Sequence, residues 1–512
     1  MKKQILLFLI STCLSGILLS QSAEITNVRK REFKGVYPII NSITNEAQGY
    51  YTFYVNEKVG GGKINFIVAI YDIEMKLVKQ TPITITKYSN VDGSEFNGKE
   101  FMFIFNDYVK KTLTYVTVDA NGDIIKTVGI KEEKRYAATA DVYSSQDGFY
   151  IVKPIKEKKW GYSIEKIDRE LNTKWEKRFV VEKGMVGVEA IQSGEDRIIV
   201  IQVAKPSLMS TKVAAEIVCL SDISGDELYR YPLYDGTNTC MPSAFLIDKE
   251  KNIVTGGMYF DGEKWDATNS DGIFFLKLSP EGKKVSLSLS DWDEGIQKFL
   301  KEGTKKTVSI SSKPKILFHE IIEGTDGNYQ VVGETFKKNI QVVSSALKDV
   351  ITGRFIGEIN SNNNNNKPVT FEVLDFIIFN FDGAGKITNL ALIEKEHTKI
   401  SCYPPYNSYG GLSLALAVKK FGFFNFGFMT NLPESDQPLL ISAVFTEKEP
   451  YIGINTIDQG KETVFHKIPV TRKTIKGGSV GTMISKPGYL GIYIYDKKEE
   501  SILMYLEKIQ MK

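Results

Sequence analysis

A strand-and-turn pattern that recurs along nearly the whole chain constrains the fold more than any other feature of this sequence. Each copy has an apolar strand of alternating character, then a second strand that ends in a turn rich in Asp, Ser and Gly. Clear copies of the turn lie at residues 116–123, 219–226, 276–283 and 379–386. Such a repeat determines which fold the chain can adopt but says little about which reaction or ligand it serves.

The spacing of the turns defines the repeating unit. The turn markers Asp72, Asp119, Asp168, Asp222 and Ser279 follow one another at intervals of 47 to 57 residues. All-strand repeats with a period of about 40 to 50 residues are typical of propeller blades, in which a four-stranded sheet recurs around an axis. We therefore predict an all-β fold, a β-propeller of about eight four-stranded blades. Seven blades are the alternative if the last two units merge.

Two segments interrupt the repeat. The interval from Ser279 to Asp382 is about twice the normal length, and the surplus maps to a polar insertion at about residues 336–367. The Asn-rich run 360–366 has no apolar side chains to bury, so we expect a long loop there. One short helix is expected at residues 292–302, where apolar side chains recur at helical spacing.

The seventh unit is the least regular of the eight. We expect its first two strands at residues 412–418 and 423–429. In the second of these, Phe424, Phe426 and Phe428 alternate with polar or small residues, as a half-buried strand requires.

The two ends of the chain are expected to meet in one blade. The last unit has strands near residues 480–484, 489–495 and 502–508 and lacks a fourth. Residues 25–34 can supply that strand, which would close the ring and remove the exposed strand edges of an open array. Residues 23–512 are therefore interpreted as a single β-propeller domain.

The N-terminus predicts export. Lys2 and Lys3 precede an apolar stretch at residues 5–19 and a group of small residues at 20–23, which is the order found in secretory signal peptides. We interpret residues 1–22 as a signal peptide and expect a periplasmic, cell-surface or extracellular protein. The apolar run is shorter than the ~20 residues of a spanning helix, so no transmembrane segment is expected in the mature chain.

Charge and cysteine content narrow the classes of partner. The formal net charge of the whole chain is +3, and loss of Lys2 and Lys3 leaves the mature chain nearly neutral. A nearly neutral chain has no long-range field for nucleic acid, so no nucleic-acid partner is expected. Beyond the leader only Cys219, Cys240 and Cys402 remain. Three cysteines are too few for a disulfide scaffold, and stability must come from the apolar core.

Motifs for catalysis or metal binding are weak. His319 and Glu320 are adjacent in a predicted strand, so their side chains should point to opposite faces, and a structural role is favoured. The acidic loop that begins at Asp261 resembles a calcium loop, but Glu263 and Asp266 break the required spacing, and a hairpin turn is the better interpretation. Signatures of nucleotide, zinc and Ser-based chemistry are missing from the sequence.

We therefore assign no catalytic, cofactor-binding or metal-ligating residue, and no cofactor. A carboxylate pair for glycoside cleavage is defined by its separation across a cleft, which a sequence does not give, so that chemistry stays open. The repeated Asp119, Asp222 and Asp382 are interpreted as turn residues that accept backbone hydrogen bonds.

Aromatic side chains in or next to predicted loops are the best candidates for ligand binding. They are Trp160, Trp265, Tyr403 and Tyr406. Propeller ligands sit at a face made of such loops, as binding residues on rigid scaffolds do. The alternative is that these aromatic rings fill the junctions between blades.

The sequence also resembles a known group of proteins. The segments 332–336 and 371–376 that flank the insertion, and the turn at 381–385, occur together with the repeat and the leader. In this combination the chain resembles an uncharacterised family of secreted bacterial β-propeller-like repeat proteins, a domain of unknown function. The resemblance covers the mature chain and implies a fold but no activity.

Three functions are compatible with this pattern. The first is an exported, non-enzymatic propeller that acts as a binding scaffold for a protein or glycan at one face of the ring. The second is a secreted polysaccharide hydrolase or lyase, and the third is a structural component of the envelope. An enzyme should bring carboxylates or histidines together at the mouth of the channel, whereas a binder should present aromatic side chains.

Overall fold

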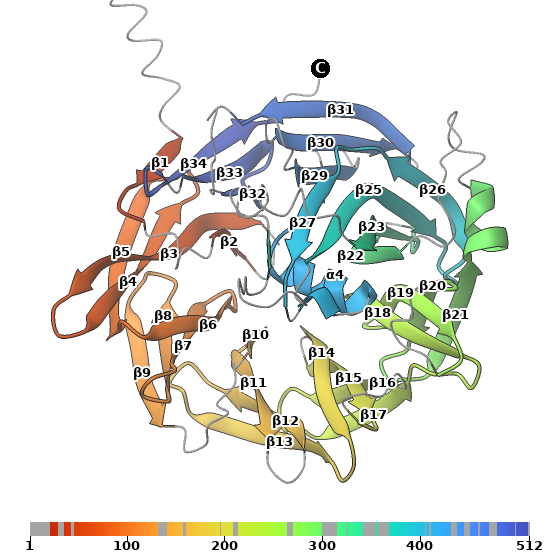
Figure 1. The fold of residues 1–512 in the computed structure, drawn as a ribbon, viewed down its shortest axis with the longest axis horizontal. Helices are drawn as coiled ribbons and strands as arrows, with labels where there is room; N and C mark the ends of the chain where they lie inside the picture. Colours follow the sequence, from red (N-terminus) through yellow and green to blue (C-terminus); the bar gives the residue numbers. More distant parts are fainter. Residues whose placement is uncertain are drawn as a thin grey trace, which may run out of the picture.

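The computed structural model describes most of the chain. The described residues are 21–28, 35–41, 46–131, 141–156, 160–194, 196–207, 213–263, 270–299, 315–324, 326–340, 355–356, 368–404, 406–408, 411–431, 438–444, 451–458, 461–470, 479–496 and 498–509. They form eight sheets arranged in a ring (Figure 1). The predicted all-β propeller is confirmed, and so is the predicted number of eight blades, which excludes the alternative of seven.

Seven blades follow one another along the chain, and in each of the first five the first strand is the innermost (Figure 1). The first blade consists of β2 (Val36–Ile40), β3 (Ala47–Val59), β4 (Lys63–Asp72) and β5 (Leu77–Thr86); the second of β6 (Ser89–Phe96), β7 (Glu100–Asp107), β8 (Thr112–Asp119) and β9 (Ile124–Lys131). The third consists of β10 (Asp141–Ser145), β11 (Gly148–Lys156), β12 (Trp160–Ile167) and β13 (Thr173–Val181); the fourth of β14 (Met185–Ser193), β15 (Arg197–Lys205), β16 (Ala214–Ser221) and β17 (Glu227–Pro232). The fifth consists of β18 (Asn238–Ile247), β19 (Ile253–Asp261), β20 (Gly272–Leu278) and β21 (Lys284–Asp291), and the seventh of β28 (Phe426–Asn431), β29 (Pro438–Val444), β30 (Tyr451–Asp458) and β31 (Lys461–Pro469).

The sixth blade is branched. Its strands are β22 (Lys315–Glu323), β23 (Tyr329–Ile340), β25 (Val369–Phe381), β26 (Ile387–Ile393), β27 (Thr398–Cys402) and the short β24 (Phe355–Ile356). The second half of β25 pairs with β26, whereas its first half pairs with β27 and with the end of β23. Residues 336–340 are therefore strand, and the prediction that the loop starts at Phe336 is wrong. The Asn-rich run 360–366 lies outside the described residues.

The eighth blade joins the two ends of the chain. It consists of β32 (Ser479–Ile484), β33 (Tyr489–Asp496), β34 (Ser501–Lys508) and β1 (Ser22–Ile25), with β1 antiparallel to β34. Closure by an N-terminal strand is confirmed, but the strand begins three residues before the predicted position. Beyond it, the buried Val28 donates its backbone N–H to the carbonyl of Glu500 at 2.7 Å.

Within the described residues, helical segments occur at two places between blades. A π-helical turn, η2 (Trp292–Ile296), follows β21 and is capped by the Asp291 side chain. Helical residues continue to 299, so the helix predicted at 292–302 is confirmed as far as the structure describes it. The second place follows β27 and holds η3 (Tyr406–Ser408) and α4 (Gly411–Lys420). The prediction of a strand at 412–418 is therefore wrong, and Phe424 precedes β28 instead of belonging to it.

The helix α4 lies near the centre of the ring when the molecule is viewed as in Figure 1. It packs on β22 and β23 of the sixth blade. At its C-terminal end the Lys420 Nζ atom lies 3.4 Å from Asp141 Oδ1 of β10, in the third blade. The helix therefore links two blades that are far apart in the ring order.

The repeated turns hold neighbouring blades together. The Oδ1 atoms of Asp119 and Asp382 accept backbone hydrogen bonds from residues two and four positions later, as predicted. Asp222 was expected to do the same, but Ser221 occupies the equivalent turn position. Because of this one-residue offset, the buried Asp222 side chain instead reaches Lys166 of the preceding blade, with Oδ2 and Nζ 2.8 Å apart.

In three of the turns the glycine approaches an aromatic ring of the preceding blade, whereas Gly122 approaches Ile70 of the first blade. Gly282 has φ of +77°, and a Cβ atom there would lie 2.3 Å from Cδ2 of Tyr229. Gly225 meets Trp175 and Gly385 meets Phe275 in the same way. The turn pattern that reveals the repeat in the sequence is thus also a contact between blades.

This contact predicts a measurable cost for a single methyl group. Gly282→Ala should destabilise the fold by about 1 to 3 kcal/mol more than Gly327→Ala in urea unfolding. Gly327 has φ of +75° but nothing within 4 Å of its Cβ position, so the control carries the same backbone strain without the clash. Equal losses for both variants would show that the Tyr229 ring can move aside.

Candidate functional site

A pocket opens between the inner strands of the first three blades. It has a volume of about 430 Å³, and its lining consists of Tyr37, Pro38 and Ile40 of β2, Tyr51 of β3, Ser94, Glu95 and Phe96 of β6, Asn97 and Gly98 of the following turn, and Ser144 of β10. A volume of this size suits a small organic ligand. Because β2, β6 and β10 are innermost strands, the pocket lies on the axial side of the ring (Figure 1).

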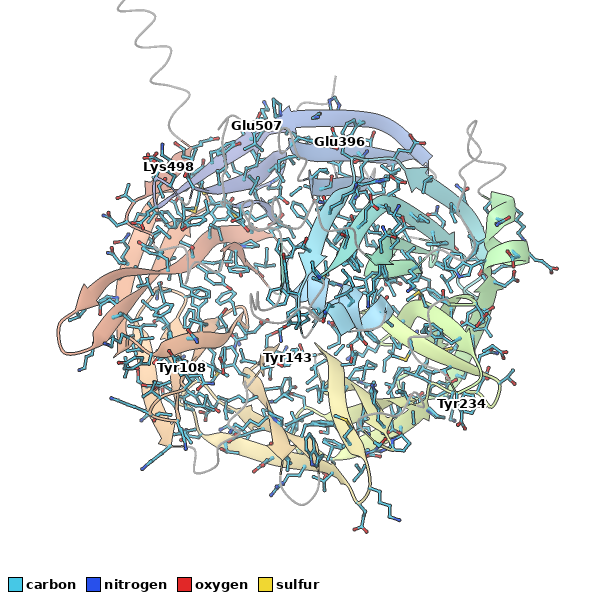
Figure 2. The ribbon with its side chains drawn as sticks, viewed as in Figure 1. Tyr108, Tyr143, Tyr234, Glu396, Lys498 and Glu507 are labelled. Carbon is cyan, nitrogen blue, oxygen red and sulfur yellow. The ribbon has the colours of Figure 1, made fainter. Side chains whose placement is uncertain are left out.

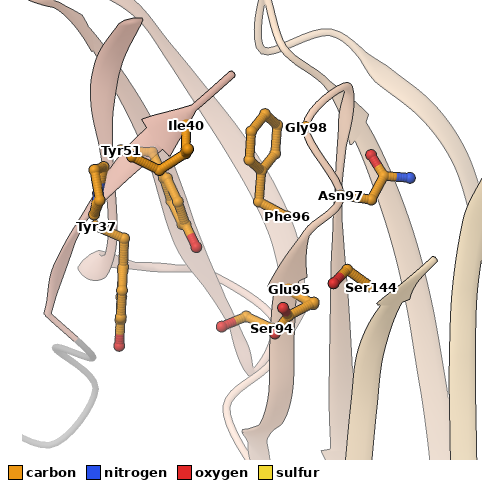
Figure 3. A pocket seen from close by; sticks show the side chains of 10 residues that line it. Tyr37, Ile40, Tyr51, Ser94, Glu95, Phe96, Asn97, Gly98 and Ser144 are labelled. Atoms are coloured by element: carbon orange, nitrogen blue, oxygen red, sulfur yellow. The ribbon is translucent and has the colours of Figure 1, made fainter. Parts of the chain in front are cut away.

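Aromatic rings form one wall of the pocket. Figure 3 shows Tyr37 and Tyr51 on one side and Phe96 facing them from β6. The rings of Tyr37 and Tyr51 are stacked with centroids 5.3 Å apart, and the centroids of Tyr51 and Phe96 are 6.3 Å apart. Tyr51 is fixed from behind by Phe101 of β7, at 4.6 Å in an edge-on arrangement. Tyr37 remains 37% exposed, although burial of its hydroxyl group raises the pKa of this side chain.

The opposite side of the pocket is polar. Glu95 and Ser144 lie next to each other in Figure 3. Burial raises the pKa of Glu95 to about 7, although a hydrogen bond with Ser144 works in the opposite direction. Near the middle of the ring, burial also raises the pKa of Tyr143, assisted by the negative charges of Asp141, Glu95 and Glu189 (Figure 2). The polar side therefore combines a carboxyl group that titrates near neutral pH with hydroxyl groups.

Asn97 fixes the turn that closes the pocket. Its Oδ1 atom accepts hydrogen bonds from the backbone N–H groups of Lys99 and Glu100 at 3.0 and 2.8 Å. Its Nδ2 group donates to the carbonyl of Gly148 in the third blade at 3.2 Å. Since these bonds use the amide on both sides, Asn97 positions the pocket and joins two blades.

The raised pKa of Glu95 predicts a pH dependence of stability. Between its ordinary value of 4.5 and about 7 the folded protein binds a proton that the unfolded chain releases, so this stabilisation is present below pH 4.5 and is lost as the pH rises through 7. The thermal midpoint of the native protein should therefore fall from pH 5 to pH 8 relative to that of Glu95→Gln. Parallel pH profiles would place the Glu95 carboxyl in open solvent.

A second cluster of ionisable groups is sealed from solvent between the sixth and seventh blades. Glu334 of β23 is fully buried; its Oε2 atom lies 3.1 Å from His319 Nε2, and its Oε1 atom lies 3.1 Å from Lys395 Nζ. The carboxylate also accepts hydrogen bonds from the backbone N–H groups of Asn425 and Phe426. Burial opposes ionisation of Glu334, but Lys395 and His319 outweigh it and lower the pKa of the carboxyl. A cluster without access for a ligand stabilises the fold.

His319 reaches this cluster because β22 contains a bulge. The register of β22 against β23 shifts between Phe318 and Glu320, so His319 is the extra residue. Its ring stacks on Phe426 at 4.9 Å, while Glu320 accepts a hydrogen bond from the backbone N–H of Met429. The predicted structural role of His319 agrees with this burial. The expectation that the two neighbours serve opposite faces is wrong, since both contact β28.

The aromatic residues singled out from the sequence do not gather in one place. Trp160 begins β12 in the third blade and is 38% exposed. Tyr403 is buried after β27, and Tyr406 is half-buried against Phe421 at 5.6 Å. None of these three lines the pocket, and Trp265 lies outside the described residues. The pocket residues were missed because Tyr37 and Glu95 are far apart in sequence and follow no motif.

The chain matches one protein family over almost its whole length. The family of unknown function DUF6770 covers residues 1–510. The chain belongs to this family. This match confirms the predicted resemblance to an uncharacterised family, and the eight sheets confirm that its fold is a propeller. Among curated proteins, no sequence matches this DUF6770 protein.

Solved structures similar to this DUF6770 protein are remote. The quinohemoprotein alcohol dehydrogenase from Comamonas testosteroni has 10% identity and a TM-score of 0.41, over 97% of this chain and 78% of that one. The propeller domain of the Trilobed protease from Pyrococcus furiosus has 8% identity and a TM-score of 0.37, over 86% and 96%. A protein of unknown function from Bacteroides caccae has 11% identity and a TM-score of 0.26, over 68% and 97%. None of them carries an argument about function.

The search for a membrane-crossing helix gives a negative result. Among the residues that the structure describes, no helix combines the length and the apolar character that a bilayer span requires.

Proposed function

We propose that this DUF6770 protein is an exported carbohydrate-binding propeller that holds a sugar in the pocket between β2, β6 and β10 without cleaving it. The observation that supports this most directly is the composition of the pocket. Three aromatic rings, Tyr37, Tyr51 and Phe96, share a cavity of about 430 Å³ with a carboxyl group and hydroxyl groups. This combination matches the two kinds of surface that a sugar ring presents.

The chemistry of a sugar explains the combination. The C–H groups on one face of a pyranose pack against aromatic rings, whereas its hydroxyl groups need hydrogen-bond partners at the rim. Tyr37, a partly exposed residue of the pocket lining, offers its ring for the apolar face. Glu95, Ser94 and Ser144 provide donors and acceptors on the opposite side.

The same lining favours binding over hydrolysis. Glycoside cleavage uses two carboxyl groups about 5 to 10 Å apart, one on each side of the scissile bond. Glu95 is the single acidic residue among the described residues that line the pocket. Incubation with polysaccharides is therefore expected to release no reducing ends. Release that Glu95→Gln abolishes would assign the pocket to a hydrolase or lyase instead.

Calorimetric titration with a panel of monosaccharides and oligosaccharides tests the binding itself. At least one sugar should bind, and Tyr37→Ala should weaken it about tenfold or more, since it removes the exposed ring of the wall. Tyr108→Ala is the matched control, because Tyr108 is 63% exposed and lies outside the pocket lining. Binding that survives Tyr37→Ala unchanged would move the ligand to another surface, such as Trp160 or Tyr406.

Export is the second part of the proposal. It is supported by the charged, apolar and small-residue order of residues 1–23. Because β1 begins at Ser22 and the Gln21 carbonyl accepts a hydrogen bond from Leu506, we place the cleavage at or before Gln21. N-terminal sequencing of the exported protein tests this placement. A mature chain that starts after Ile25 would lack β1 and contradict it.

A further inference from the structure

Three buried carboxylates elsewhere in the ring are each paired with a lysine. Each has a lysine ammonium within 3.1 Å: Glu334 pairs with Lys395 at 3.1 Å, Asp222 with Lys166 at 2.8 Å, and Asp248 with Lys277 at 3.0 Å. A carboxylate removed from water needs such a counter-charge, because its own desolvation is costly. The fold thus supplies a lysine to each of these three acids, whereas the buried Asp107 is held by hydrogen bonds from Thr86 and from the backbone N–H groups of Val109 and Lys110.

In the part of the chain that the structure describes, Glu95 has neither a lysine partner nor the set of backbone donors that holds Asp107. Its hydrogen bond is made with Ser144, and among the described residues no lysine or arginine forms an ion pair with it. It differs from the three paired carboxylates in one further respect, since it lines an open pocket instead of a closed junction. A counter-charge can therefore reach Glu95 from outside the protein.

The remainder of the pocket also suits a positive charge. The rings of Tyr37, Tyr51 and Phe96 lie around the same cavity as the carboxylate. The negative face of an aromatic ring attracts a cation within about 6 Å of the ring centroid, and the attraction grows when water is excluded. An acid beside several aromatic rings is thus a cage for an ammonium group.

We propose that the pocket selects a sugar that carries a free, protonated amine, with the ammonium group bound between Glu95 and the aromatic rings. This inference rests on the proposed function, of which it specifies the ligand class. A neutral or N-acetylated sugar lacks the positive charge and leaves Glu95 without a counter-ion.

Two matched pairs of probes separate the inference from the proposed function. Glucosamine and glucose differ in charge on one sugar, while choline and 3,3-dimethyl-1-butanol differ in charge on a molecule that is not a sugar. Each is titrated at pH 7.5 into the native protein, Glu95→Gln and the control Glu396→Gln. Glu396 lies on the outer side of the ring, beside Lys467 (Figure 2).

Glucosamine should bind about tenfold or more tightly than glucose, and Glu95→Gln should reduce this ratio towards one while Glu396→Gln preserves it. Equal binding of both sugars to the native protein would overturn the charge selectivity and leave sugar binding intact. Choline binding that needs Glu95, without binding of either sugar, would support the cation site and overturn the sugar. Binding of none of the four would overturn both. A thermal midpoint of Glu95→Gln close to or above that of the native protein shows that the variant is folded.

Discussion

Replacement of Glu334 by Ala should lower the free energy of unfolding by about 3 to 5 kcal/mol, because it leaves the buried Lys395 ammonium without its carboxylate. The side chains of Glu334, Lys395 and His319 are each at most 4% exposed, so water cannot take over the lost contacts. The backbone N–H groups of Asn425 and Phe426 would also lose their acceptor. Urea unfolding at pH 7, followed by tryptophan fluorescence, measures the loss.

Two further variants show that burial causes this loss. Glu396→Gln removes a carboxylate from an exposed pair with Lys467, in which the side chains are 55% and 47% exposed, and should change stability by no more than about 1 kcal/mol. The double variant Glu334→Gln with Lys395→Met removes both charges and should recover part of the loss, since no uncompensated ion remains. A double variant less stable than Glu334→Ala would mean that the pair itself, and not the stranded charge, carries the energy.

The repeat could be predicted because its determinants are local. Each turn begins with its own Asp or Ser, and its residue of positive φ is a glycine in the clear copies and Met75 or Leu171 in the two weaker ones. The sequence therefore carries the period directly. The run that forms α4 shows the limit of this local information. Residues 412–418 alternate large and small side chains with a period of two, but Leu and Ala also favour helices, and short apolar runs are ambiguous. Lys419 and Lys420 in the last turn, and Gly422 beyond it with φ of +72°, decide for a helix.

The candidate site could not be predicted from local patterns. Tyr37 and Glu95 lie on strands of different blades, and only the ring order brings these strands together. The contact between His319 and Glu334 could not be predicted for a different reason. A single extra residue in β22 turns its side chain towards Glu334, and no sequence signal marks such a bulge. Contacts between residues of different blades therefore become visible only in the tertiary structure, whereas the blades themselves can be predicted from the sequence of each repeat.

Removal of β1 should have an effect as large as the loss of Glu334. Ile25 and Val28 are buried in the junction between the eighth and first blades, together with Ile502 and Met504 of β34. Burial of each of the two N-terminal side chains contributes about 1.5 to 3 kcal/mol, so a chain that starts at residue 29 should lose about 3 to 6 kcal/mol relative to one that starts at residue 21. Urea unfolding of the two chains measures the difference.

The truncated chain should also self-associate, because β34 becomes an edge strand. In the closed ring its backbone pairs with β1 from Ser22↔Tyr505 to Ile25↔Ile502. Without β1 these N–H and C=O groups face solvent and offer a template for a strand of another copy. Light scattering should therefore find oligomers of the chain that starts at residue 29 and monomers of the chain that starts at residue 21. Equal stability and equal mass for both would mean that contacts such as that between Lys486 and Glu74, at 2.6 Å, close the ring without the strand.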